Sequence, residues 1–213
     1  MIEITVDQRT IAVEQGANLL SACLEAGIYI PHLCHLPGLE PAASCRLCFV
    51  ALEGEAAPVP ACTITVTAPL TVISDAPAVR RLQRSALALL LSAHTIDCRR
   101  CPANRQCELQ RIARFLGMPL KRPNLPPARP PCAPPTACHE LVVDTTHCVL
   151  CGRCVRLCRD RNGTSKLSFA GRGYDTVVTD WVTAETPIHC ADCGACINAC
   201  PVKAIRPAPA QGE

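Results

Sequence analysis

The sequence predicts an α+β protein made of three small domains and a proline-rich connector, and three observations support this fold class. Apolar and polar residues alternate at the N-terminus, which is the period of a half-buried strand. Two later stretches place apolar residues three and four apart, which is the period of a helix. Eighteen of the 213 residues are cysteines, mostly in closely spaced groups, whereas aromatic residues make up only 3%. A chain with so few large rings builds a thin core, so bound metal is expected to contribute to its folding free energy.

The N-terminal segment begins with a predicted hairpin. Residues Ile2 to Val6 alternate in polarity, and Thr10 to Val13 form the expected return strand after a short turn. Asn18 to Ala26 is predicted to be a short helix that ends at Gly27. Cys23 lies on the apolar face of this helix, so we interpret it as a buried structural thiol.

A loop rich in cysteine, CHLPGLEPAASCRLC, follows this helix, and a further strand is expected from Leu70 to Ser74. A hairpin, a helix and then a cysteine loop are the opening of a β-grasp ferredoxin, so we predict a [2Fe–2S] centre. The spacing Cys-x10-Cys-x2-Cys-x13-Cys differs from that of a plant-type ferredoxin, whose first gap is x4. The alternative is a zinc knuckle with four cysteines. The predicted ligands are Cys34, Cys45, Cys48 and Cys62.

The next segment is predicted to start with a helix whose apolar stripe contains Val79, Leu82, Ala86, Leu89 and Ala93. Three cysteines follow it, one fewer than a cubane cluster needs. A histidine stands at the helix end, four residues before the first cysteine, and its neutral ring nitrogen would complete the set. The alternative is a surface histidine or a pH-sensitive contact. The predicted ligands of this [4Fe–4S] cluster are His94, Cys98, Cys101 and Cys107.

The last third of the chain contains two cysteine runs, CVLCGRCVRLCRD and CADCGACINACPV. Each has the spacing Cys-x2-Cys-x2-Cys-x3-Cys, which is typical of bacterial ferredoxins, where the fourth cysteine binds the cluster of the other run. Zinc needs only four thiolates and leaves these longer runs unexplained. We therefore predict two [4Fe–4S] clusters. One has the ligands Cys148, Cys151, Cys154 and Cys200, and the other has Cys158, Cys190, Cys193 and Cys196.

A change of composition separates the two halves of the chain. Residues Pro119 to Pro135 include eight prolines and predict an extended connector. Cys132 and Cys138 complete no ligand set, and we interpret them as incidental or redox-sensitive thiols. Strands are expected at Leu167 to Ala170 and at Thr176 to Thr179. The predicted division is a β-grasp [2Fe–2S] domain (1–75), a helical His/Cys3 [4Fe–4S] domain (76–118), the connector (119–136) and a two-cluster ferredoxin-like domain (137–213).

The order of these motifs resembles one protein family over nearly the whole chain. The phrases CHLPGLEPAASCRLC, CPANRQCELQ and GRGYDT carry the resemblance. The family comprises the iron–sulfur (gamma) diaphorase subunit of NAD-reducing nickel–iron hydrogenases, the N-terminal region of the complex I large iron–sulfur subunit, and the N-terminal segments of iron-only hydrogenases and NAD-linked formate dehydrogenases. The resemblance implies one [2Fe–2S] and three [4Fe–4S] clusters, a flavoprotein NAD(H)-binding partner and a catalytic partner subunit.

The function expected from these motifs is electron relay. The sequence contains no Gly-x-Gly-x-x-Gly or Walker motif and no acid–base constellation apart from the clusters, so we expect no nucleotide site and no catalytic residue in this chain. The leading hypothesis is the relay subunit of a NAD-linked [NiFe] hydrogenase, because no hydrogenase or molybdopterin domain follows before Glu213. The alternative is the relay subunit of a formate dehydrogenase or of an NADH:acceptor oxidoreductase.

Location and charge give two further expectations. The N-terminus has no export signal, so we expect a cytoplasmic protein with reduced thiols and without membrane insertion. The formal charge of +3 is also consistent with a different class of protein, a zinc-stapled RNA-binding module. However, cluster-bound thiolates would make the net charge negative, so no nucleic-acid partner is expected. The candidate RNA contacts are Arg99, Arg100, Arg153, Arg156 and Arg159.

Overall fold

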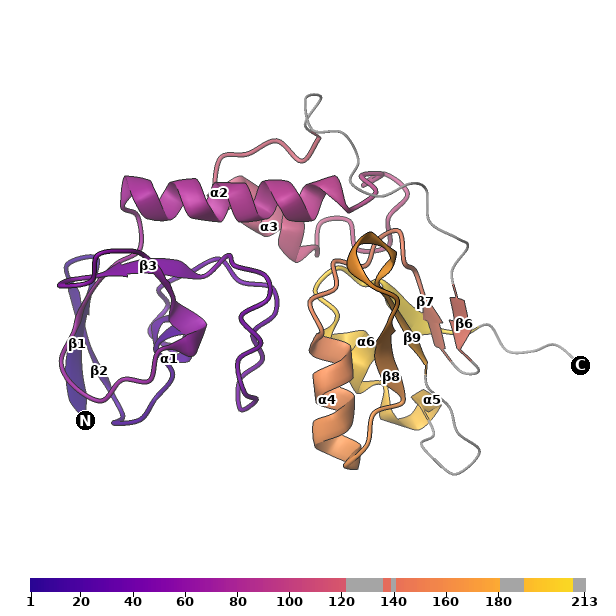
Figure 1. Cartoon of the computed structure of the whole chain (residues 1–213), viewed down its shortest axis with the longest axis horizontal. Helices are drawn as coiled ribbons and strands as arrows, with labels where there is room; N and C mark the ends of the chain where they lie inside the picture. Colours follow the sequence, from indigo (N-terminus) through magenta and orange to yellow (C-terminus); the bar gives the residue numbers. More distant parts are fainter. Residues whose placement is uncertain (122–135, 139–140, 181–189, 209–213) are drawn as a thin grey trace, which may run out of the picture. The chain divides into compact units, whose positions relative to one another are not determined.

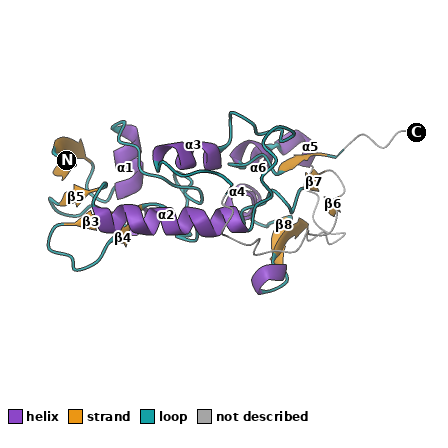
Figure 2. Cartoon of the chain, turned by 90° about the horizontal axis from the view of Figure 1, so that it is seen from above, coloured by secondary structure: helices purple, strands orange, loops and turns teal. Residues whose placement is uncertain are grey.

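The computed structural model describes residues 1–121, 136–138, 141–180 and 190–208. The chain forms two compact units, the first containing residues 1–89 and 112–118, the second containing 90–111 and 119–213 (Figure 1). Each unit contains both helices and strands (Figure 2), so the predicted mixture of helices and strands is confirmed. The division into three domains with a connector stays a prediction. Most of the connector, with Cys132, lies outside the described residues.

The first unit is built on a five-stranded sheet with the order β2-β1-β5-β3-β4. The predicted hairpin is present, and its two strands pair antiparallel with Ile2 opposite Val13. Asp7 and Gln8 form its turn with positive φ angles of 47° and 69°, the backbone that a tight hairpin requires. The strands are β1 (Ile2–Val6), β2 (Arg9–Val13), β3 (Phe49–Leu52), β4 (Val59–Pro60) and β5 (Thr71–Ile73).

Helix α1 (Leu19–Glu25) packs on this sheet and begins at an Asn cap. The side-chain oxygen of Asn18 accepts a hydrogen bond from the backbone N–H of Ser21 at 3.2 Å. Its amide nitrogen donates to the carbonyl of Cys62 at 2.7 Å, in the 3-10 turn η1 (Ala61–Thr63). One side chain therefore starts the helix and ties it to the segment of the fourth predicted thiol.

Helix α2 (Pro77–Ser92) forms as predicted, but its buried face differs from the predicted stripe. Leu89 is 70% exposed, whereas Gln83 is fully buried. The Gln83 amide donates to the carbonyl of Phe49 at 3.0 Å and accepts from Arg80 at 3.2 Å, so both ends of the buried amide have partners. A later helix, α3 (Glu108–Phe115), begins directly after Cys107.

The second unit contains two small sheets and short helices. Strand β7 lies between β6 and β10, and β8 pairs with β9, close to the two strands predicted there. The hydrophobic core of the second unit includes Cys154 and Cys190 beside Leu141, Val143 and Ile205, so thiols form part of this core. The elements are β6 (Thr136–Cys138), β7 (Leu141–Val143), α4 (Arg153–Asn162), β8 (Leu167–Ala170), η2 (Gly173–Asp175), β9 (Val177–Asp180), α5 (Cys190–Cys193), α6 (Ala195–Ala199) and β10 (Ile205–Pro207).

A membrane-spanning helix is not found within the described ranges, since none of their helices is both long and apolar enough.

We predict that Asn18→Ala lowers the free energy of unfolding by about 1–2 kcal/mol, because it removes the helix cap and leaves the Cys62 carbonyl without this donor. Asn18→Asp is the comparison variant, since it keeps the capping oxygen but places an acceptor oxygen instead of the amide donor beside the Cys62 carbonyl. Anaerobic guanidinium unfolding followed by circular dichroism measures both. Equal midpoints for Asn18→Ala and the unmodified chain would contradict the role of this cap.

Candidate metal centres

The four cysteines predicted to hold the [2Fe–2S] cluster converge inside the first unit. All four side chains are buried, with exposures of 6% or less. Cys34 is hydrogen-bonded to Cys45, and Cys48 to Cys62. The two pairs also interact electrostatically with each other, through Cys34 with Cys62 and Cys45 with Cys48. The structure therefore brings the whole predicted set to one place.

Each pair contains one thiol that donates a proton and one sulfur that accepts it. The hydrogen bond from Cys45 lowers the pKa of Cys34 to about 5, although burial opposes this. The Cys48 thiol likewise lowers the pKa of Cys62. The donors Cys45 and Cys48 have raised pKa values, first because they give up these bonds on ionisation and second because they are buried. A metal cluster that binds all four as thiolates must therefore displace the two shared protons.

The loop backbone also points toward these sulfurs. Ala43 and Arg46 have positive φ angles of 48° and 53°, which non-glycine residues rarely adopt. Backbone N–H groups of this loop bond the sulfurs, that of Ala43 reaching Cys62 and that of Leu47 reaching Cys45. Such bonds favour thiolates, so the strained loop supplies part of the charge compensation for a cluster.

The three cysteines that follow α2 also lie together, in the second unit. Burial raises the pKa of Cys107, and the nearby Cys101 and Cys98 thiols raise it further. Backbone N–H groups of Leu109 and Gln110, in the first turn of α3, bond the Cys107 sulfur and act in the opposite direction.

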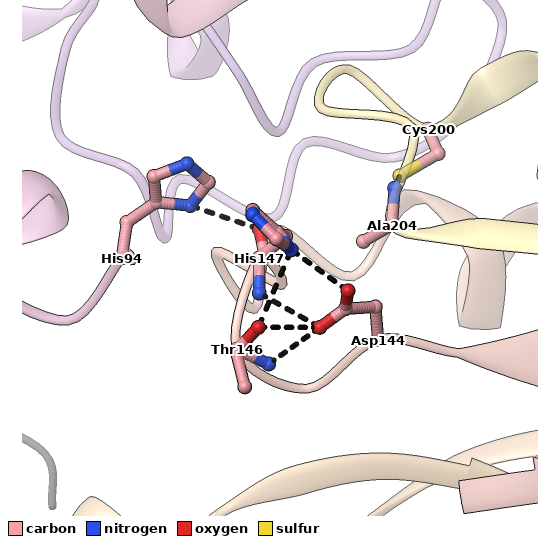
Figure 3. Close-up of polar contacts among 6 residues, drawn as sticks. All are labelled: His94, Asp144, Thr146, His147, Cys200 and Ala204. Carbon is pink, nitrogen blue, oxygen red and sulfur yellow. Dashed lines mark hydrogen bonds and ion pairs between the residues drawn. The ribbon is translucent and has the colours of Figure 1, made fainter. Parts of the chain in front are cut away.

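His94 is held by one hydrogen bond that defines its tautomer. Its Nδ1 lies 3.0 Å from the backbone carbonyl of His147, and a carbonyl only accepts, so Nδ1 carries the proton (Figure 3). Burial, helped by the neighbouring His147, lowers the pKa of His94 to about 4. The ring is therefore neutral near pH 7, and Nε2 has the free lone pair that a metal ligand needs. The other ring nitrogen points away from His147 (Figure 3).

The first cavity of the ferredoxin-like runs is lined by three cysteines of the first run and one of the second. The rest of its wall is mainly apolar and includes Val143, Val178 and Ile205. Burial raises the pKa of Cys154, and the charges of neighbouring thiols raise it further. The four thiols of this cavity are Cys148, Cys151, Cys154 and Cys200.

The second cavity is lined by one cysteine of the first run and three of the second. Arg161 and Asn162 contribute to its wall. Burial raises the pKa of Cys196 to about 11, with Cys190 and Cys158 adding to the effect. Its four thiols are Cys158, Cys190, Cys193 and Cys196. The fourth cysteine of each run thus lies in the cavity of the other run, which is the arrangement that the spacing predicts.

Both exchanged cysteines accept a backbone hydrogen bond. Ala204 N–H donates to Cys200 Sγ at 3.2 Å, and Lys166 N–H donates to Cys158 Sγ at 3.4 Å. Hydrogen bonds to cluster sulfurs are one way in which a protein sets a reduction potential.

In the part of the chain that the structure describes, no group of three or more His, Cys, Asp or Glu side chains forms a site for a single metal ion. Instead, four thiols line each of the two cavities, three from one run and one from the other. A cluster of several irons suits this donor set.

Sequence reasoning missed the turn that holds His94. Asp144, Thr146 and His147 come directly before the first cysteine run, where an Asp followed by Thr residues indicates a turn bonded through its own side chain. That signal identifies a turn, but it gives no indication that the turn contacts a histidine 53 residues away.

Comparison with known proteins agrees with the motifs. Residues 1–77 match the 2Fe-2S iron-sulfur cluster binding domain, and residues 83–122 match the NADH-ubiquinone oxidoreductase-G iron-sulfur binding region. The chain is 32% identical over 205 residues to a NADH-quinone oxidoreductase subunit of Rhizobium meliloti, covering 96% of this chain and 24% of the relative. The chain is therefore a homologue of this oxidoreductase subunit and shares its iron–sulfur binding domains with the two matched families. The predicted family resemblance is therefore confirmed.

Two further relatives are linked to hydrogenases by name. The chain is 33% identical over 217 residues to NADP-reducing hydrogenase subunit HndD of Solidesulfovibrio fructosivorans, covering 96% of this chain and 36% of the relative. It superposes with a TM-score of 0.83 and 29% identity on a chain of the crystal structure of NAD+-reducing [NiFe]-hydrogenase in the H2-reduced state, covering 98% of this chain and 88% of that one. The chain thus spans 24% and 36% of the two curated relatives named here.

Cys23 is outside these sites and has the properties of an inert thiol. It is fully buried in the core of the first unit, and burial together with the charge of Asp7 raises its pKa to about 11. At pH 8, below that pKa, it stays protonated and unreactive. We predict that Cys23→Ala leaves the iron content unchanged and that Cys23 resists iodoacetamide in the folded protein, both measured by mass spectrometry. Loss of iron in this variant would contradict its structural role.

Proposed function

We propose that the chain is an electron-relay subunit of a NAD-linked oxidoreductase, with one [2Fe–2S] and three [4Fe–4S] clusters. One observation carries the proposal most strongly: two cavities are each lined by four thiols, and each takes its fourth thiol from the other cysteine run. That exchange is the ligand arrangement of two-cluster ferredoxins and has no counterpart in a zinc knuckle.

The proposed ligands follow from the four groups of donors. The [2Fe–2S] cluster would be held by the two hydrogen-bonded thiol pairs, and one [4Fe–4S] cluster by His94 Nε2 with three cysteines. When bound, the clusters supply one-electron chemistry, while the chain supplies ligands, N–H···S bonds and exclusion of water. The four sets are Cys34, Cys45, Cys48 and Cys62; His94, Cys98, Cys101 and Cys107; Cys148, Cys151, Cys154 and Cys200; and Cys158, Cys190, Cys193 and Cys196.

The proposed partners are a flavoprotein that binds NAD(H) and a catalytic subunit of [NiFe] hydrogenase type. The structural similarity at a TM-score of 0.83 to a chain of a NAD+-reducing [NiFe]-hydrogenase, of which this chain covers 88%, supports this choice. The similarity to the NADH-quinone oxidoreductase subunit of Rhizobium meliloti supports the second candidate, a relay subunit of an NADH:acceptor oxidoreductase. Native mass spectrometry of the complex, which identifies the co-purified subunits, distinguishes the two. Both would work in the cytoplasm, where thiols stay reduced.

The test of the proposal is metal analysis with spectroscopy. We expect a brown protein with about fourteen irons and an equal amount of labile sulfide per chain. A colourless protein with zinc and no labile sulfide would refute the relay function and support the zinc-stapled module instead.

The exchange of fourth cysteines predicts a crossed effect of mutation. Cys200→Ala lies in the second run, but we expect it to disrupt the cluster of Cys148, Cys151 and Cys154. Cys158→Ala is the matched variant, with the opposite effect. Electron paramagnetic resonance of each reduced variant identifies the lost signal. Loss of the same cluster in both variants would contradict the exchange.

His94→Cys should keep a cubane but lower its midpoint potential, because a thiolate adds one negative charge that an imidazole lacks. A redox titration followed by paramagnetic resonance measures the shift. The potentials of the other clusters serve as internal controls, since their ligands are unchanged. An unchanged potential at every cluster would remove His94 from the ligand set.

A further inference from the structure

The turn that precedes the first cysteine run is anchored at both ends. Asp144 follows strand β7, and its N–H donates to the carbonyl of Ala204 at 2.8 Å. Ala204 in turn donates its own N–H to Cys200 Sγ (Figure 3). At the other end, the N–H of Cys148 donates to the carbonyl of Asp144 at 3.0 Å. The turn therefore has a fixed base between two thiols of the first cavity.

The carboxylate of Asp144 determines the shape of this turn. Its Oδ1 accepts hydrogen bonds from Thr146 N–H at 3.0 Å, Thr146 Oγ1 at 2.6 Å and His147 N–H at 3.3 Å. Its Oδ2 contacts His147 Nδ1 at 2.7 Å. The carboxylate points into the turn and gathers these donors (Figure 3). Four interactions from two adjacent residues leave the turn backbone little freedom.

The backbone of this turn accepts hydrogen bonds from the segment that contains His94. The carbonyl of His147 accepts from His94 Nδ1 at 3.0 Å, and the carbonyl of Thr146 accepts from Thr95 N–H at 3.0 Å. The rings of His94 and His147 meet edge to face, with centroids 5.4 Å apart. The orientation of the His94 ring thus depends on where the turn places one carbonyl.

A role as a stabilising ion pair does not explain this arrangement well. The side chains of Asp144 and His147 are 28% and 20% exposed, so water partly screens their ion pair. Three of the four contacts of the carboxylate go to turn donors other than the His147 ring. The carboxylate acts mainly on backbone geometry.

We propose that Asp144 is a positioning residue for His94. By fixing the turn, it keeps the His147 carbonyl on His94 Nδ1, which holds the proton there and leaves Nε2 as the ligand nitrogen. Hydrogen bonding of the second ring nitrogen of a metal-bound histidine fixes its tautomer and raises its basicity. This proposal rests on the proposed ligation of a cluster by His94.

The test is pulsed paramagnetic resonance of the reduced full-length protein, which detects nitrogen nuclei coupled to the cluster. In the unmodified protein we expect a directly bound nitrogen and a remote one, Nδ1, whose quadrupole coupling reports its hydrogen bond. Asp144→Ala should shift that quadrupole coupling and raise the midpoint potential of this cluster, because a more weakly basic ring donates less charge. Asp144→Asn should remain close to the unmodified protein, since its Oδ1 still accepts from Thr146 and His147.

Three controls make the outcomes distinct. Asp7→Ala removes a comparable turn carboxylate, which accepts from Ser74 N–H at 2.7 Å in the first unit, and should leave the nitrogen couplings unchanged. In a His94→Cys background, Asp144→Ala should have no effect on the potential of this cluster. If Asp144→Ala fails to fold, as judged by loss of the [2Fe–2S] signal, Thr146→Val removes one donor to Oδ1 and should shift the same coupling by a smaller amount.

Ligation by His94 and positioning by Asp144 are refuted by different results. Absence of any coupled nitrogen in the unmodified protein refutes ligation by His94. A coupled nitrogen whose remote quadrupole coupling is the same in the unmodified protein and in the Asp144→Ala or Thr146→Val variant refutes the positioning role of Asp144. An Asp144→Asn variant as altered as Asp144→Ala also refutes it, since charge and not turn geometry would then be the cause.

Discussion

The second unit depends on the exchange of Cys158 and Cys200 between the two cavities. Each of these thiols is the fourth cysteine of its own run, yet each lines the cavity that contains the first three cysteines of the other run. The strands β7 and β10 and the helices α4 and α6 that surround them are only three to ten residues long. Such short elements bury little apolar surface, so metal bound by the exchanged thiols would contribute a large part of the folding free energy.

Burial of many thiols sets the second constraint on the structure. Burial raises the pKa of Cys154 and Cys196, which opposes the thiolate form that a cluster requires. The chain compensates with backbone N–H donors, as at Cys158 and Cys200, and with loops in unusual conformations, as at Ala43. These devices favour the ionised sulfur in the absence of metal, and the positive charge of bound irons would complete the compensation. Folding and metal binding would then be coupled.

The turn at Asp144 lies between the segment of His94 and the first cysteine run. The His147 carbonyl that accepts from His94 belongs to the peptide group whose nitrogen is that of Cys148. The Thr146 carbonyl accepts from Thr95 N–H, and the His147 ring contacts the His94 ring. A change in this turn would therefore be transmitted to His94 through these contacts and to the first cavity through the chain itself.

The sequence by itself determined the donor groups, because cysteine spacing is a direct consequence of how a short loop meets a cluster. Hairpin, helix and strand positions near Ile2, Leu19 and Leu167 also followed from local periodicity. The buried face of α2 did not: apolar spacing favoured Leu89, whereas the tertiary structure buries Gln83 because the Phe49 carbonyl offers a partner. The pairing of Cys34 with Cys45, the tautomer of His94 and the contact between His94 and the Asp144 turn were likewise decided only in three dimensions. Each depends on one carbonyl or one proton from a distant segment, and local sequence does not encode where that atom lies.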